Sequence, residues 1–77
     1  MANEGATMSR KLAKACLRSM FERVAECGDQ ARAARELLAL GRIDEAMNIA
    51  YEIEPALYEA NHLMQSASLL RREGRER

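Results

Sequence analysis

The sequence predicts a small all-α protein, an antiparallel bundle of about four helices joined by short connections. Alanine and leucine dominate, and Glu, Arg, Lys, Gln and Met fill most other positions; all of these residues favour helices. β-branched residues are few, and no stretch alternates apolar and polar residues as a half-buried strand does. Glycine and proline stand where helices of ordinary length would begin and end, which sets the expected boundaries.

The first helix is expected from about residue 9 to residue 27. Its apolar residues recur at steps of three and four, which places them on one face of a helix. Gly28 is expected to end it, because glycine tolerates the left-handed conformation that follows many helices. The apolar positions are Leu12, Ala13, Cys16, Leu17, Met20, Phe21, Val24 and Cys27.

Two shorter helices are expected next, at about 29–40 and 43–53. Asp29 is a favourable N-cap for the first of them, and Gly41 is expected to close it. In the second, acidic residues occupy the first turn, where negative charge suits the helix dipole. The short connection between them predicts antiparallel packing.

The fourth helix is expected at about 55–72, with Pro55 at its first position, where the missing N–H costs nothing. The residue before a proline disfavours helical geometry, so we expect a break there. Residues 9–72 would then form a single domain. Residues 1–8 and 73–77 are expected to be flexible tails.

A chain of 77 residues has a thin core, because a domain this small buries only about 60% of its unfolded surface. Such domains often gain stability from a partner. Apolar residues outside the main stripes predict a non-enzymatic protein-binding module, that is, a small adaptor, chaperone or inhibitor, and we also expect a homo-oligomer. The expected interface comprises Met20, Phe21, Ile49, Tyr51, Tyr58 and Leu69.

Charge is unevenly distributed although the formal net charge is zero. Residues 9–23 carry five basic residues and one acidic residue, whereas residues 36–59 carry six acidic residues and one basic residue. Such segregation can steer a partner or align two copies of one chain. Arg10, Lys14 and Arg18 are expected to form a basic face that orients the partner.

The alternative interpretation is a small regulatory protein associated with nucleic acid through the basic first helix and the C-terminal arginines. The neutral net charge argues against it. The helix that follows Gly41 carries acidic residues, which would repel phosphates if that helix entered a DNA groove. We therefore expect nucleic acid not to be the partner.

Residues that could perform chemistry are sparse. His62 has Glu59 one turn earlier but no nucleophile beside it, so a structural role is expected. Cys16 and Cys27 would stand roughly 16 Å apart on one helix, too far for a disulfide. They are expected to be small buried apolar residues, the alternative being pairing with the cysteines of a second copy. No catalytic site, metal site or cofactor is expected.

The expected location is the cytoplasm, without membrane insertion. The first residues contain no apolar stretch of the kind found in signal peptides. The longest purely apolar run is 37–40, much shorter than the ~20 residues that span a bilayer.

Residues 31–58 resemble one tetratricopeptide repeat, a pair of antiparallel helices with a glycine at the turn. Ala34 and Leu37 match the small and large positions of the first helix, and 41–46 match the turn and the start of the second. Gln30 replaces the usual large residue, and Pro55 comes about three residues early. The resemblance implies a helical groove that binds a peptide or helix, as in small helical chaperones of bacterial secretion systems.

Overall fold

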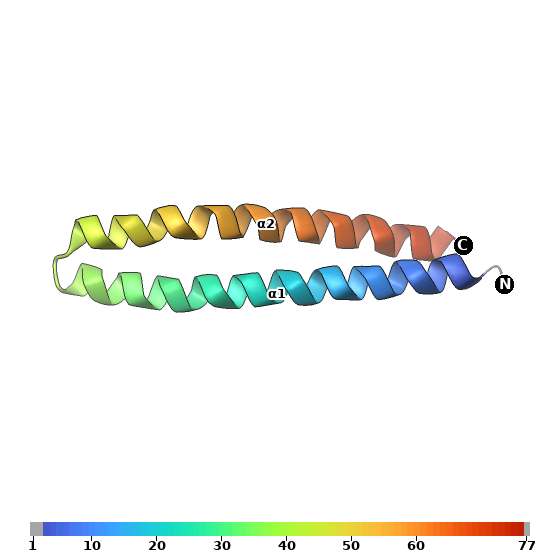
Figure 1. Ribbon diagram of the computed structural model, residues 1–77, viewed down its shortest axis with the longest axis horizontal. Helices are drawn as coiled ribbons and strands as arrows, with labels where there is room; N and C mark the ends of the chain where they lie inside the picture. The colour runs from blue at the N-terminus through green and yellow to red at the C-terminus, as the bar shows by residue number, and fades with distance from the viewer. Residues whose placement is uncertain (1–2, 77) are drawn as a thin grey trace.

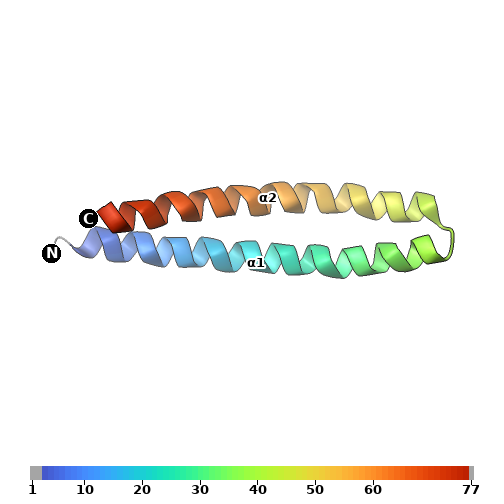
Figure 2. The ribbon, with the colours of Figure 1, turned by 180° about the vertical axis from the view of Figure 1, so that it is seen from behind.

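The computed structural model describes residues 3–76 as two long antiparallel helices, α1 (Asn3–Ala39) and α2 (Ile43–Glu76). The helices lie side by side along their whole length, and both termini lie at the end opposite the turn (Figures 1 and 2). The hairpin measures 61 × 14 × 12 Å, with a radius of gyration of 17.5 Å. A compact domain of this length has a radius of gyration near ~11.5 Å. The all-α prediction is confirmed, whereas the four-helix bundle is wrong.

The turn between the helices forms at Gly41, as predicted. Gly41 has a φ of 75°, in the left-handed region that favours glycine. Its N–H donates to the carbonyl of Leu38 at 3.0 Å, and the N–H of Arg42 donates to that of Leu37 at 2.9 Å. This pair of bonds is a Schellman motif, which satisfies the last carbonyls of α1.

The predicted boundary at residues 27–29 does not exist, because α1 continues through Gly28 (Figure 1). A glycine inside a helix costs only about 1 kcal/mol relative to alanine. Residues on both sides of Gly28 pack against α2. This packing outweighs the preference of glycine for a helix end. Asp29, expected as an N-cap, instead forms an ion pair with Arg32 one turn later.

The predicted break before Pro55 is also absent, and α2 runs through this residue as one helix. Proline removes one backbone hydrogen bond and costs ~3 kcal/mol inside a helix. Pro55 lies on the exposed side of α2, where water can solvate the carbonyl that loses its donor. Ile53 and Ala56, on the opposite side, pack toward α1 and maintain the helix.

The helices also extend into the segments expected to be tails. Residues 3–8 belong to α1 and residues 73–76 belong to α2. The remaining residues of those two segments lie outside the described part of the chain.

The contact between the helices, here called the seam, follows a seven-residue repeat. Its positions alternate at steps of three and four without interruption, as in a coiled coil. Every member is buried or half-buried. The seam comprises Ala6, Ser9, Ala13, Cys16, Met20, Arg23, Cys27, Gln30, Ala34 and Leu37 of α1, and Ala46, Ile49, Ile53, Ala56, Ala60, Leu63, Ala67, Leu70 and Gly74 of α2.

Small side chains form the buried centre of the seam. The buried apolar residues are Ala6, Ala13, Cys27, Ala46, Ala60 and Ala67. Among the described residues, no large side chain is fully buried. Small residues let two helices approach closely, but each of them buries little apolar area. Burial stabilises the fold by only about 0.8 kcal/mol per methyl or methylene group. The hairpin therefore has a close seam but a weak core.

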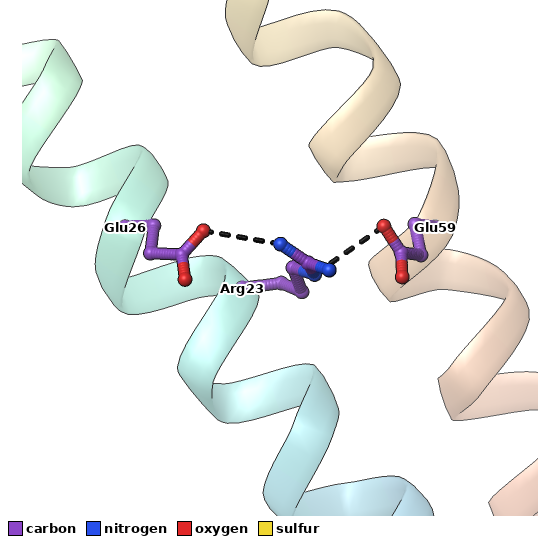
Figure 3. A network of polar contacts seen from close by, with 3 residues as sticks. All are labelled: Arg23, Glu26 and Glu59. Carbon is purple, nitrogen blue, oxygen red and sulfur yellow. Dashed lines mark hydrogen bonds and ion pairs between the residues drawn. The ribbon is translucent and has the colours of Figure 1, made fainter.

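The helices lie close together at two places along the hairpin. A Cβ added at Gly74 would lie 3.5 Å from the carbonyl oxygen of Ala6 and 3.4 Å from Cγ of Arg10, so the helix ends are close together. Near the middle, Arg23 pairs with Glu26 on α1 and with Glu59 on α2, both at 3.3 Å (Figure 3).

Candidate protein-binding site

A second stripe of apolar residues runs beside the seam on each helix. These residues also recur at steps of three, four or seven, so they share one side of their helix. Together they form what we call the apolar face. It comprises Leu17, Phe21, Val24, Ala31 and Leu38 of α1, and Ile43, Met47, Ala50, Leu57 and Met64 of α2.

The two helices contribute to the same side of the hairpin. Leu17 of α1 and Met64 of α2 line one shallow groove, together with the seam residues Ala13 and Ala67. Because each stripe keeps its position along its helix, the remaining members follow the same side toward the turn. The apolar face thus covers roughly 33 Å of the hairpin, from Leu17 to Leu38.

The large side chains of the apolar face are exposed to solvent. Leu17 is the most covered, at 37% exposure, whereas Phe21 is 62% exposed. Leu57 and Met64 are about half exposed. Contiguous exposed apolar surface of this kind marks interaction sites in soluble proteins, while scattered exposed apolar residues do not.

Acidic residues of α2 line the opposite edge of the hairpin. Glu45, Glu52, Glu59 and Glu73 recur there at steps of seven or fourteen along α2. The ion pair from Arg23 to Glu59 lies on this edge (Figure 3). On α2, one edge is therefore suited to water and the other to an apolar partner.

The predicted interface residues are divided among three places. Met20 and Ile49 are half-buried seam residues, and Phe21 belongs to the apolar face. Tyr51, Tyr58 and Leu69 are exposed. They lie on the side of α2 that faces away from α1, here called the outer face of α2, which also carries Pro55 and His62.

On the outer face of α2, Tyr58 and His62 contact each other through their rings. The centroids are 4.6 Å apart and the planes make an angle of 74°, an edge-to-face arrangement. Residues one turn apart on a helix commonly make such a contact. The contact orders two side chains on the outer face of α2.

The predicted basic residues lie toward the terminal end of α1. Lys14 and Arg18 line a surface hollow with Leu17 and Phe21, beside the apolar face. Arg10 lies at the edge of the seam, where its Cγ approaches Gly74. Antiparallel pairing of the helices also brings Arg71 and Arg72 of α2 to this end. Basic residues from both ends of the sequence therefore gather at one end of the hairpin.

Both cysteines are free, Cys27 buried and Cys16 half-buried in the seam. Within residues 3–76, no group of three His, Cys, Asp or Glu side chains could hold a metal ion. Over the same residues, neither helix has an apolar stretch long enough to cross a membrane.

Comparison with known protein families, curated proteins and solved structures finds no match for this chain. The tetratricopeptide resemblance therefore stays a prediction. The turn at Gly41 lies where the resemblance expects it, but both helices continue past residues 31 and 58 without a break.

Three members of the apolar face were expected on one face of the first helix. Leu17, Phe21 and Val24 were placed there together with residues that the structure places in the seam. The stripe of residues 12–27 is too wide for one neighbouring helix to cover, because it spans both a seam and a flanking row. That excess width is the sequence signal that could have identified the apolar face.

Proposed function

We propose that this protein is a non-enzymatic protein-binding module, an adaptor, chaperone or inhibitor, that works by packing its apolar face against helices of another protein chain. The apolar face carries this proposal: large exposed residues line one side of the hairpin, whereas the apolar residues that are buried in the seam are all small. A helix pair with such a face gains stability when another apolar surface covers it.

The accessible surface supports the proposal in magnitude. The chain exposes 6053 Å², whereas a compact monomer of this mass exposes about 4,700 Å². The excess is roughly 1,300 Å², and a stable interface needs ~800 Å² from each partner. The elongated chain as a whole therefore exposes enough extra surface for an interface of standard size.

A pull-down from the source cell tests the proposal. The bait would be the wild-type chain and the variant Val24→Glu/Leu57→Glu, which places two charges on the apolar face. Proteins bound by the wild type should be lost from this variant, because a buried unpaired carboxylate is strongly unfavourable.

The matched control is Ala15→Glu/Gln65→Glu, which adds the same charge at exposed positions outside the apolar face. It should bind like the wild type, and circular dichroism should show equal helicity in all three chains. If all three baits retain the same proteins, the apolar face is not the binding site.

One observation favours a second candidate, binding to nucleic acid. The fold gathers Lys14, Arg18 and the C-terminal arginines Arg71 and Arg72 at one end of the hairpin. A gel shift with random DNA that weakens with salt and is lost in Lys14→Glu/Arg18→Glu would support this candidate. Absence of any shift at low salt would eliminate it.

A further inference from the structure

We propose that a second copy of this chain covers the apolar face, with its turn at the opposite end, so that four helices from two chains share one core. This inference rests on the proposed function and names the partner of the same face. Three features of the hairpin lead to it: the large exposed area of the elongated chain, the position of Phe21 and the distribution of charge.

The exposed area of the elongated chain is sufficient for a second copy. The excess surface over the whole chain is roughly 1,300 Å², against the ~800 Å² per partner of a standard interface. Two flat helix pairs stacked face to face form a four-helix bundle, in which helices pack close to antiparallel.

Phe21 stands at the midpoint of α1, Asn3–Ala39, and on the apolar face. A two-fold axis perpendicular to the helices at this point places Phe21 against Phe21 of the second copy. Leu17, one turn before, then comes opposite Val24, one turn after. The centre of the resulting interface is apolar on both sides.

Charge determines which ends come together. Residues 3–20 and 60–76, the terminal half of the hairpin, carry seven basic and three acidic residues. Residues 21–59, the turn half, carry four basic and nine acidic residues. The hairpin is therefore positive at the end with the termini and negative at the end with the turn (Figure 1).

Two copies with both turns at one end would bring like charges together along the whole length. With the turns at opposite ends, each positive terminal half lies on a negative turn half. Charge complementarity of this kind guides association and fixes the alignment of partners. The same chain supplies both halves, so a second copy satisfies the charge pattern without any other protein.

Sedimentation equilibrium tests the occupant of the face. The wild type should have twice the mass of the chain at high concentration. Phe21→Glu should raise the dimer dissociation constant at least about a hundredfold, whereas the control Ala15→Glu should leave it within about twofold. A dimer that is equally stable in Phe21→Glu would overturn the assignment of the face.

A wild-type chain that stays monomeric at high concentration would overturn the second copy as partner. The proposed function then has its own readout, since a monomer with an open apolar face binds the dye anilinonaphthalenesulfonate and loses that binding in Val24→Glu/Leu57→Glu. A monomer that does not bind the dye contradicts the proposed function as well.

Spin labels at the turn test the alignment. Arg42→Cys is labelled in a background with Cys16→Ala and Cys27→Ala, and circular dichroism checks helicity. Turns at opposite ends should give a label separation near ~55 Å, the length of α1. A separation below about 25 Å, two helix diameters, would overturn the alignment.

Salt provides a second test of the alignment. Raising the salt concentration from about 0.05 to 0.5 M should weaken the dimer, because screening removes the attraction between the positive and negative halves. A dimer whose dissociation constant does not depend on salt contradicts the alignment.

Discussion

The seam and the apolar face run in parallel along the same two helices but differ in the size and burial of their side chains. The seam buries small residues such as Ala13, Ala60 and Ala67, at 4–7% exposure. The apolar face presents large residues such as Phe21 and Leu57, at half exposure or more. In an isolated stable domain the large apolar residues would be the buried ones.

The difference shows how the tasks of the two surfaces are divided. Small side chains determine how closely α1 and α2 approach, so the seam sets the shape of the hairpin. Large side chains carry most of the apolar area, about 1.5–3 kcal/mol each when fully buried. That free energy becomes available only when another chain covers the apolar face.

Enlarging a residue in the centre of the seam should have the largest effect. Ala60 is 5% exposed, so Ala60→Phe must push the helices apart. We expect the free energy of unfolding to fall by about 3 kcal/mol, near the upper limit for overpacking. Urea unfolding followed by circular dichroism measures it. The control Ala15→Phe, on an exposed site, should change stability by at most ~0.5 kcal/mol. Equal effects would mean that the seam is loosely packed.

Truncating the central aromatic of the apolar face should have the next largest effect. Phe21→Ala is expected to raise the dimer dissociation constant about 30-fold, or ~2 kcal/mol, as for a central interface residue. The matched variant Tyr51→Ala removes an aromatic from the outer face of α2 and should leave the constant within about twofold. A larger loss in Tyr51→Ala would move the interface to the outer face of α2, where Tyr51, Tyr58 and Leu69 of the predicted interface lie.

Two glycines should respond with opposite signs. Gly41→Ala forces a side chain into the left-handed region and should cost about 1–2 kcal/mol. At Gly28 an added Cβ meets nothing within 4 Å, so Gly28→Ala should stabilise the hairpin by up to about 1 kcal/mol. Thermal unfolding measures both. If Gly28→Ala lowered the unfolding temperature instead, the added methyl group would have met closely packed neighbours on the apolar face.

The ion pair across the helices should have the smallest effect. Arg23 and Glu59 are 44% and 52% exposed, so solvent screens their attraction. Glu59→Gln is expected to lower stability by less than about 1 kcal/mol. A double-mutant cycle with Arg23→Gln isolates the pair. A coupling above that limit would show that another chain desolvates this edge too.

The sequence was sufficient for the helical class and for the turn at Gly41, because composition and the glycine both indicate them. It was misleading at Gly28 and Pro55, where local signals of about 1–3 kcal/mol favour helix ends. Packing across the seam outweighs these signals, and it involves residues far apart in the sequence. The seven-residue repeat that continues past both positions is the pattern that predicts two long helices.

The candidate site was only partly predictable. Phe21 was expected in the interface, which stays a prediction; the structure leaves its side chain 62% exposed, at the edge of a wide apolar stripe. Met20 and Ile49 are apolar and were also predicted in the interface, but the position of α2 relative to α1 places them in the seam. Side chains one residue apart on a helix differ by about 100° in direction. Assigning each to a surface therefore requires the partner helix to be known.

The dependence of the unfolding temperature on protein concentration tests most directly whether another copy completes the core. For a protein that folds as a dimer, mass action raises the unfolding midpoint as concentration increases. We predict this rise for the wild-type chain, and a lower, concentration-independent midpoint for Val24→Glu/Leu57→Glu. A wild-type midpoint that is independent of concentration and equal to that of the variant would contradict the account.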